Sequence, residues 1–487
     1  MKLNRVHIIL LLIFLSSFIF QLFFALQVPF YSSDNAYFNL RHSKYISENF
    51  VPLIFDPLSY GGNYILDTHI YHYFLGIFDI IFPEVIYKIL PCLLSSLIVF
   101  IVFLLSKEIT PDDNSSLFAA SLSAFIPTFL TLTLNQISVV SAYIPLFFLA
   151  IYLFLKIRSR QSIFLYISIF LILLDPLNLL LLFTFIIFGL LMLSQSLEIK
   201  SQEYEALGLV ISFLLLVNLI LYKSVYLTEG LSAIWEDVPL EIYGNIFQNF
   251  NLLETITLIG IIPLILGIIG IILYKKKNTI ITLLSSIILA DFTLLLLRLI
   301  PFKEGLIFLS VVLCILSGIT FFNFRKYIFI TKLFSYEKFF IILLVLISIA
   351  SLIIPSIYAS SSVINENIQQ SEIDALQWFK FNTPRDSVVA ANVYEGNLII
   401  SISDRTNIID NQFINAEDRI SDVNLLFKTE SLIKAKKVLD KYNVDYIYFS
   451  QKSKELYNIE TLTYTIDETC FKEVYKNEFA TIYKVVC

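Results

Sequence analysis

The segment Met1–Gln27, "MKLNRVHIILLLIFLSSFIFQLFFALQ", begins with basic residues and continues as an apolar run. This run is longer than the core of a typical signal peptide and lacks a small-residue cleavage site, so we interpret it as a retained membrane span. Similar runs recur as far as about Pro355. They are too long for barrel strands, and only a helix satisfies its backbone internally in lipid. The sequence therefore predicts a polytopic α-helical membrane protein.

The composition agrees with this class. Of the 487 residues, 57% are hydrophobic and only 15% are charged, which is far from the balance of a water-soluble domain. The formal net charge is −6, and no clustered basic face is present, so the sequence argues against a nucleic-acid partner.

Basic residues predict how the spans are oriented. Lys2 and Arg5 precede the first span, which places the amino terminus in the cytoplasm. About eleven spans then form a membrane domain over residues 1–358, with large external loops at 29–83 and 223–251. This count puts nearly every basic cluster on the cytoplasmic side: Lys107, 156–160, Lys200, 275–277, Arg325, Lys326, Lys332 and Lys338.

Residues 359–487 have a different composition and predict a small extracytoplasmic α/β domain. Two segments are typical of helices, "SEIDALQWFKFNTP" and "ESLIKAKKVLDKYN", and two are typical of strands, "DSVVAANV" and "VDYIYFS". Cys470 and Cys487 flank a predicted hairpin that would bring them close together. A disulfide between them is therefore one possibility outside the cell, and free thiols are the other.

The first external loop, "SSDNAYFNLRHSKYISENFVPLIFDPLSYGGNYILDTHIYHYF" (Ser32–Phe74), is rich in ionisable residues. Asp34 follows the first span almost directly, and Arg41 shares its face if the segment is helical. Further candidate ligands follow in the loop: Asp56, Asp67, His69 and His72. Carboxylates and imidazoles here could hold a divalent metal against a lipid phosphate, with Arg41 holding a carboxylate in place. The alternative is a solvated loop with interfacial tyrosines.

Two other segments carry candidate site residues on the same predicted side. In "SAIWEDVP", Glu236 lies beside Trp235, where shielding from water could raise its pKa or orient it toward a bound group. An exposed acidic loop is the alternative. In "LLLLRLIPFKEG", Arg298 ends an apolar span, where a guanidinium can bind a phosphate or extend to lipid headgroups.

These segments resemble, in order, motifs of the catalytic subunit of oligosaccharyltransferase, the N-glycosylation enzyme of archaea and eukaryotes. "SSDNAYFNLRHSKYISEN" resembles its first-loop motif, "SAIWEDVP" a later external-loop motif, and "LRLIPF" an arginine-bearing span. "VVAANVYEGNLIISISDRTNIIDN", followed by "AKKVLDKYNVDYIYFS", resembles the start of its external domain. The resemblance implies the GT-C fold of membrane glycosyltransferases.

The resemblance also implies an activity: transfer of a sugar or glycan from a polyprenyl-phosphate or -diphosphate carrier to a protein acceptor on the outer face. Asp34 would bind a catalytic divalent metal, Mn²⁺ or Mg²⁺. The residues implied to contact the donor phosphate are Arg298, His69 and Arg41. Those implied to contact the acceptor are Glu236, Tyr394 and Glu395.

Departures from the family pattern leave metal binding and the acceptor open. The loop that carries a second acidic metal motif in the family here contains "LTLNQISVVSAYIP", without any acid. The family's acceptor motif "WWDYG" corresponds to "NVYEG". The sequence therefore allows two alternatives: the same fold acting on a lipid or sugar acceptor, or a non-catalytic relative that serves as a partner subunit.

Overall fold

The computed structural model describes residues 5–175, 178–198, 200–228, 251–273, 278–331, 336–411 and 417–487. The chain divides into two compact units. A helical unit consists of Met1–Val28, Glu84–Ile220 and Phe247–Asn365. A second unit, here called the α/β unit, includes Pro29–Pro83 and Glu366–Cys487.

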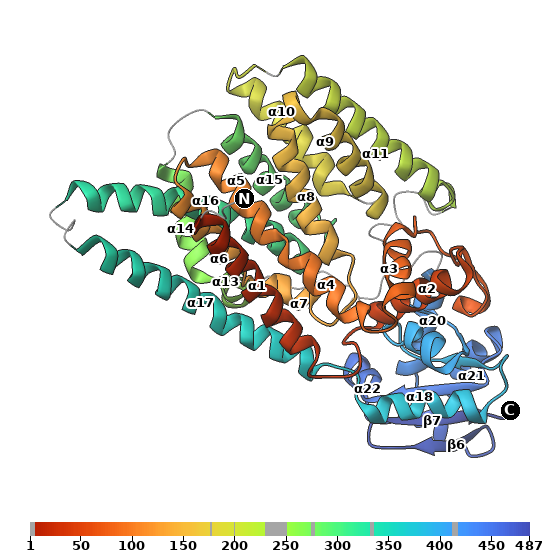
Figure 1. The fold of residues 1–487 in the computed structure, drawn as a ribbon. Coiled ribbons are helices and arrows are strands. Elements are labelled where there is room, and N and C mark those ends of the chain that lie inside the picture. Colours follow the sequence, from red (N-terminus) through yellow and green to blue (C-terminus); the bar gives the residue numbers. More distant parts are fainter. Residues whose placement is uncertain are drawn as a thin grey trace. The chain divides into compact units, whose positions relative to one another are not determined.

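The helical unit is built from helices, several of them long (Figure 1). In chain order they are α1 (Arg5–Ala25), α4 (Ile86–Ser96), α5 (Ile98–Ile109), α6 (Asp113–Ser123), α7 (Pro127–Thr133), α8 (Val140–Leu155), α9 (Ile157–Leu174), α10 (Leu179–Ser194), α11 (Ser201–Thr228), α13 (Leu252–Ile259), α14 (Ile261–Leu273), α15 (Thr279–Leu296), α16 (Phe302–Ile330) and α17 (Glu337–Asn365).

In the described part of the chain, seven helices are long and apolar enough to cross a membrane. The number rises to nine if the bent pairs α6–α7 and α13–α14 each form one span. The shorter apolar helices α8 and α10 occupy two further predicted spans, so the helices correspond segment by segment to the eleven expected from the sequence. The prediction of a multi-pass α-helical membrane protein is confirmed.

Small residues allow close packing at the centre of the helical unit. A Cβ atom at Gly267 of α14 would lie 2.6 Å from the Leu313 side chain of α16. At Gly270 it would lie 2.4 Å from the Leu316 carbonyl oxygen. Helices in lipid associate through such close contacts, because apolar burial gives little driving force there.

Three of the basic residues that the sequence assigns to one side of the membrane lie in ion pairs between helix ends. They join the end of α5 to the start of α6, the end of α8 to α5, and the last turns of α16 to the start of α6. The pairs are Lys107–Asp113 (2.8 Å), Lys156–Glu108 (2.7 Å) and Arg325–Asp112 (2.6 Å). These helix ends therefore meet at one end of the helical unit, as the predicted topology requires.

The α/β unit contains a five-stranded sheet in the order β4-β3-β5-β7-β6, where β3 is parallel to β4 and β5 and the other pairs are antiparallel. Its strands are β3 (Val388–Ala390), β4 (Thr406–Asn407), β5 (Tyr446–Ser450), β6 (Phe471–Lys476) and β7 (Ala480–Val485). Its helices are α2 (Asp34–Asn49), α3 (Ile70–Ile81), α18 (Gln370–Asn382), α19 (Gly396–Leu398), η4 (Ile399–Ser403), α20 (Glu417–Lys428), α21 (Leu432–Lys441), α22 (Gln451–Tyr457) and η5 (Thr463–Ile466). A short hairpin consists of β1 (Phe55–Asp56), η1 (Ser59–Gly61) and β2 (Asn63–Tyr64).

Alternating side chains of β5 build a core on each face of this sheet, as expected because successive strand residues point to opposite faces. Ile447 and Phe449 belong to a core with α20 and α21, whereas Tyr446 and Tyr448 belong to a core with α18. The first loop contributes one tyrosine to each core, Tyr60 and Tyr37 respectively.

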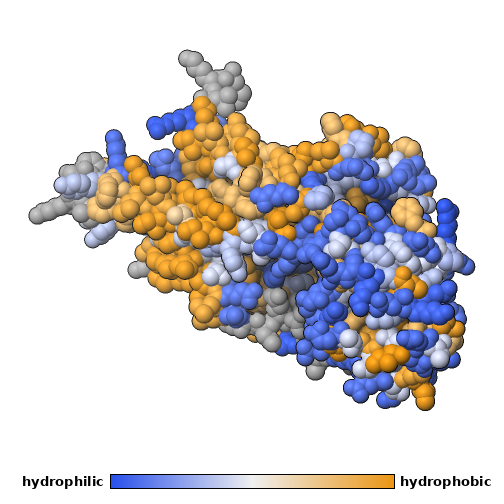
Figure 2. Space-filling view, turned by 90° about the horizontal axis from the view of Figure 1, so that it is seen from below, coloured by the Kyte–Doolittle hydropathy of each residue, from blue (hydrophilic) through white to orange (hydrophobic). Residues whose placement is uncertain are grey.

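The predicted elements of the carboxyl-terminal region are present as α18, β3, α21 and β5. The predicted hairpin is β6–β7, and Cys470 and Cys487 form a disulfide across it. The sequence placed the domain boundary after residue 358, whereas the α/β unit begins at Glu366 and also takes in the first loop. Apolar side chains gather over the helical unit and hydrophilic ones over much of the α/β unit (Figure 2).

Candidate functional site

Asp34 is the first residue of α2, where the Ser33 hydroxyl caps the helix by accepting a hydrogen bond from the Ala36 N–H. Its carboxylate is nearly enclosed, with 8% of the residue exposed. Asn397 Nδ2 donates to Oδ2 at 2.7 Å and the Leu398 N–H donates to Oδ1 at 2.9 Å. Burial raises the pKa of Asp34 to about 7, although both hydrogen bonds act in the opposite direction. The first loop and the α19 segment therefore meet at an acid that is partly protonated near neutral pH.

The α19 segment follows the predicted acceptor residues Tyr394 and Glu395. Tyr394 is half-buried, and the side chain of Glu395 is fully enclosed. Glu395 accepts hydrogen bonds from Asn392 Nδ2 and, at 3.3 Å, from Ser453 Oγ. Burial, and next the neighbouring Glu372, raise the pKa of Glu395 to about 8. An acceptor could therefore reach this carboxyl group only after a rearrangement of the turn.

Gly396 is required at this turn because the backbone passes close by. A Cβ atom there would lie 2.1 Å from the Ile409 carbonyl oxygen and 2.7 Å from Asp410. Any side chain would push the "NVYEG" turn away from residues 409–410. The glycine thus positions Asn397 and Leu398 for their contacts with Asp34.

A second set of polar contacts holds the β1–β2 hairpin of the first loop. Ser59 Oγ donates to Asp410 Oδ2 at 2.9 Å, and the Tyr60 N–H donates to Asn407 Oδ1 at 2.9 Å. The Asn407 N–H returns a hydrogen bond to the Leu58 carbonyl oxygen at 3.1 Å. Asn407 and Asp410 both belong to the segment "RTNIIDN" (405–411), so this segment holds the β1–β2 hairpin of the first loop against the carboxyl-terminal part of the α/β unit.

Arg41 lies seven residues after Asp34 on α2, but its partner is Asp56. The Arg41 Nη2 to Asp56 Oδ1 distance is 2.9 Å, and the Leu58 N–H donates to the same oxygen at 3.0 Å. Two turns of helix separate residues seven apart by about 10 Å along the axis, too far for a direct contact with Asp34. Arg41 thus holds the Asp56 carboxylate, and its predicted role beside a metal-binding carboxylate stays a prediction.

His69 and His72 lie together, joined by His42, which the sequence analysis did not select. The three rings are buried, and one ring nitrogen from each lies within 4.8 Å of the others. Burial lowers the pKa of all three histidines, that of His72 to about 4. All three are therefore neutral near pH 7. The signal that could have identified His42 was its position two turns along the helix that begins at Asp34.

Two predicted site residues cannot be placed beside these groups. Glu236 lies outside the described residues, as does its neighbour Trp235. Arg298 is exposed just after the end of α15, with a left-handed backbone (φ 55°), and belongs to the helical unit. The roles of Glu236 and Arg298 remain predictions.

The sequence analysis predicts a metal held at Asp34 by carboxylates and imidazoles, and the described residues gather no such set of ligands around Asp34. Among them, a single group of three or more histidine, cysteine or acidic side chains has mutually close ligand atoms, and it is His42, His69 and His72. Both oxygens of Asp34 already accept hydrogen bonds, and the preferred octahedral geometry of Mg²⁺ needs more oxygen donors than one carboxylate.

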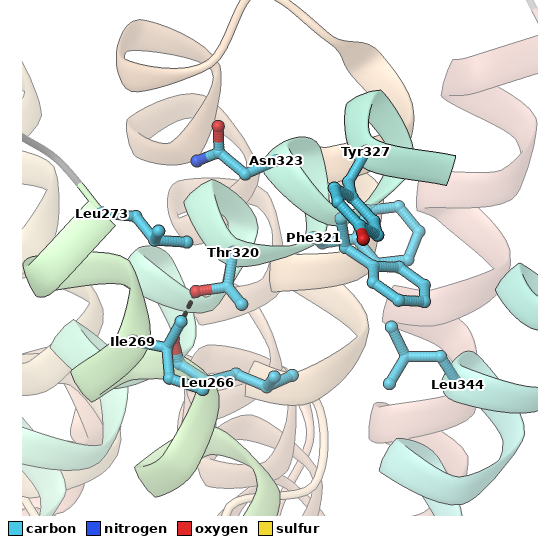
Figure 3. A pocket seen from close by; sticks show the side chains of 9 residues that line it. Leu266, Ile269, Leu273, Thr320, Phe321, Asn323, Tyr327 and Leu344 are labelled. Atoms are coloured by element: carbon cyan, nitrogen blue, oxygen red, sulfur yellow. Dashed lines mark hydrogen bonds between the residues drawn. The ribbon is translucent and has the colours of Figure 1, made fainter. Parts of the chain in front are cut away.

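A cavity of about 540 Å³ lies elsewhere, between α14, α16 and α17 in the helical unit (Figure 3). No acidic or basic side chain lines it, and the hydroxyl of Thr320 is satisfied by the Leu266 carbonyl oxygen. Such a lining suits hydrocarbon and offers no group for phosphate chemistry.

No protein-family model matches the chain, and no curated protein sequence does. Solved structures do match. A crystal structure of the Archaeoglobus fulgidus oligosaccharyltransferase, tethered to an acceptor peptide with an NVT sequon, has a TM-score of 0.66 at 15% identity, covering 96% of this chain and 74% of that one.

Two further structures of this archaeal enzyme are similar to the chain. AglB in complex with an inhibitory peptide and a dolichol-phosphate has a TM-score of 0.64 at 16% identity, covering 90% of this chain and 69% of that one. A complex with Zn and sulfate has a TM-score of 0.63 at 15% identity, covering 97% and 73%. The agreement extends over both units, and the chain therefore has the fold of an archaeal oligosaccharyltransferase.

Proposed function

We propose that this protein is an integral-membrane glycosyltransferase that transfers a sugar or glycan from a polyprenyl-phosphate or -diphosphate carrier to a protein acceptor. The observation that carries the proposal is the shared fold over 96% of the chain. The acceptor peptide and the dolichol-phosphate in the similar structures support the two substrate classes. Fold alone does not specify activity, so the proposal also rests on the enclosed acid at the start of the first loop.

In the proposed reaction an acceptor nitrogen or oxygen attacks the anomeric carbon of the donor sugar. The bond between this carbon and the phosphate oxygen breaks, its electron pair leaves with the phosphate, and the acceptor loses a proton. Configuration at the anomeric carbon is inverted by this single displacement. We assign the donor phosphate to Arg298 and Arg41, because guanidinium groups stabilise the charge that develops there. The enclosed His69 ring, 4% exposed, would reach a phosphate only after a rearrangement.

We propose Asp34 as the central catalytic carboxylate of this reaction. Asn397 and Leu398 fix the orientation of its carboxylate, and the same contacts join the first loop to the "NVYEG" turn. Glu236, Tyr394 and Glu395 are proposed to orient the acceptor. The similar structure that contains Zn and sulfate supports a divalent metal in the active enzyme, for which Mn²⁺ and Mg²⁺ are our candidates.

We also propose an orientation. The amino terminus and the helix ends that carry Lys107, Lys156 and Arg325 face the cytoplasm, which places the α/β unit outside. The rule that cytoplasmic loops carry an excess of basic residues supports this assignment. A disulfide in the α/β unit supports it as well, because disulfides persist in oxidising compartments.

The test uses the purified full-length protein, a polyprenyl-linked sugar and a peptide with an N-glycosylation sequon, in the presence of Mn²⁺ or Mg²⁺. We expect glycopeptide from the wild type and none from Asp34→Asn. Asp374→Asn, which changes an exposed acid on α18, is the matched control and should retain activity. Full activity of Asp34→Asn would remove this residue from the mechanism.

A lipid or sugar acceptor is the second candidate, and the enclosed side chain of Glu395 favours it. The turn that occupies the place of the family's acceptor motif has no exposed carboxyl group, so sequon recognition loses one of its expected contacts. Mass spectrometry of glycoproteins and glycolipids from a deletion strain separates these acceptors. A non-catalytic partner subunit would give no turnover with any acceptor or metal.

A further inference from the structure

The packing of α2 against α3 places three of the four histidines of the chain in one enclosed cluster. His42 lies on α2, His69 immediately precedes α3, and His72 lies in the first turn of α3. Their exposed fractions are 1%, 4% and 1%. Burying three imidazoles costs free energy unless their nitrogens find partners, because each ring carries two polar nitrogens.

The spacing of two ring nitrogens matches a coordination sphere, and a ring nitrogen of His42 lies within 4.8 Å of them. The Nδ1 atoms of His69 and His72 are 3.2 Å apart. Two imidazole nitrogens bound to a tetrahedral Zn²⁺ at about 2.0–2.1 Å lie about 3.3–3.4 Å from each other. In the described part of the chain, Nδ1 of His42 is buried without a hydrogen-bond partner. His42 Nδ1 is therefore available as a third ligand.

Hydrogen bonding around the cluster selects the required tautomer of His72. Its Nε2 lies 2.8 Å from Asn39 Oδ1, so the Nε2–H donates to this amide oxygen and leaves the Nδ1 lone pair facing the cluster. A ring N–H held by an outer acceptor is the usual arrangement of a metal-binding histidine. Asp67 Oδ2 lies 3.8 Å from His72 Nδ1 and supplies a negative charge beside the same nitrogen.

The backbone supports the same arrangement. His69 has a left-handed conformation (φ 56°), which histidine, like asparagine and aspartate, adopts more often than most residues other than glycine. One turn beyond His72, a Cβ atom at Gly76 would lie 2.9 Å from the Ser43 carbonyl oxygen, directly after His42. This close approach of α3 to α2 brings the three rings together.

We infer that His42, His69 and His72 bind a divalent transition metal, with Zn²⁺ as the preferred ion, and that the bound metal fastens α2 to α3. Three imidazoles suit Zn²⁺ better than Mg²⁺ or Mn²⁺, which favour oxygen ligands. The site differs from the one expected at Asp34, because His42 is eight residues further along α2, or about 12 Å at about 1.5 Å per residue. The inference does not depend on the proposed transferase activity.

The test measures metal binding to the full-length protein in detergent. The protein is stripped with a chelator, reloaded with Zn²⁺ or Co²⁺ and desalted, and bound metal is counted by elemental analysis. We expect one ion per chain in the wild type. Co²⁺ should give the intense visible absorption of a tetrahedral, nitrogen-ligated ion. If neither ion is retained and no such band appears, the inference is wrong.

Variants assign the ligands. His42→Gln and His72→Gln should each lose more than about a hundredfold in Zn²⁺ affinity, since loss of an outer partner alone costs about ten- to a hundredfold. Asn39→Ala should show that smaller loss. His7→Gln, which changes the exposed histidine of α1, is the matched control and should bind Zn²⁺ like the wild type.

Asp34→Asn should also bind one Zn²⁺ per chain, which separates this site from a catalytic metal at Asp34. Trp378 fluorescence and thermal unfolding of the metal-free proteins check that each variant folds. Wild-type affinity in folded His42→Gln and His72→Gln, or loss of the ion in Asp34→Asn, would overturn the assignment.

Discussion

Glu395→Gln tests whether the α/β unit is folded around a neutral acid. In the wild type, Asn392 and Ser453 both donate to Glu395 Oε2, and Oε1 is buried without a hydrogen-bond partner in the described residues. Glutamine keeps an oxygen that can accept both hydrogen bonds and has nearly the same shape as a protonated glutamic acid. The substitution therefore removes the ionisation of the side chain and leaves the packing unchanged.

The sign follows from the pKa of Glu395, which burial raises from 4.5 to about 8 in the folded protein. Between these values the folded state keeps a proton that the unfolded state has released. The free energy of unfolding therefore falls as the pH rises through this window, by up to about 1.4 kcal/mol per pH unit for one proton. From about pH 5.5 to about pH 7.5 this amounts to about 3 kcal/mol at most.

Trp378 of α18 is suited to report the unfolding, because it contacts Phe379, Tyr446 and Tyr475 inside the α/β unit. The chain has a second tryptophan, so the measurement uses a Trp235→Phe background. Denaturant unfolding followed by fluorescence at several pH values shows how the unfolding free energy of each protein changes with pH. We expect the difference in unfolding free energy between Glu395→Gln and the parent to grow as the pH rises.

An exposed acid on α22 provides the control. Glu455→Gln should leave the pH dependence of the parent unchanged, since its side chain is solvated in both states. If Glu395→Gln also unfolds with the pH dependence of the parent, the carboxyl group is not neutral in the folded protein. Burial would then not raise the pKa of Glu395 as stated above.

Two further substitutions test the packing of the α/β unit. Gly396→Ala should lower the unfolding free energy by about 1–3 kcal/mol, because the new Cβ would lie 2.1 Å from the Ile409 carbonyl oxygen. Gly189→Ala is the control, since the space around Gly189 is open, and it should not destabilise the protein. Equal stability of the two variants, followed by Trp378 fluorescence, would argue against the close approach at Gly396. Replacing both Cys470 and Cys487 by serine removes a disulfide between residues 17 apart and should lower the unfolding free energy by about 3 kcal/mol. An unfolding midpoint equal to that of the oxidised wild type would contradict this.

Much of the architecture could be predicted because local sequence patterns decide it. Apolar runs long enough to cross a bilayer form helices wherever water is absent, so all eleven predicted segments correspond to helices. Alternation of side chains likewise identified β5 and the β6–β7 hairpin. The amphipathic segments that became α18 and α21 were identified in the same way.

The candidate site was harder to predict, because its contacts join residues far apart in the chain. Asp34 was identified from its position after the first span, but nothing in the sequence shows that Asn397 and Leu398 would hold it. Only the fold shows that Arg41 pairs with Asp56, fifteen residues further along the chain. His42 could not be selected from the sequence, because its partners lie about 30 residues away, His69 just before α3 and His72 in its first turn.

Hydropathy and periodicity act over a few residues at a time, so they suffice to predict a multi-pass helical membrane protein with a small α/β region. That the first loop belongs to the α/β unit depends on long-range packing, which places Tyr37 and Tyr60 in its two cores. The same is true of the enclosed acids and the histidine cluster. Burial and the resulting pKa values depend on which distant segments exclude water from a side chain, and local sequence carries no record of that.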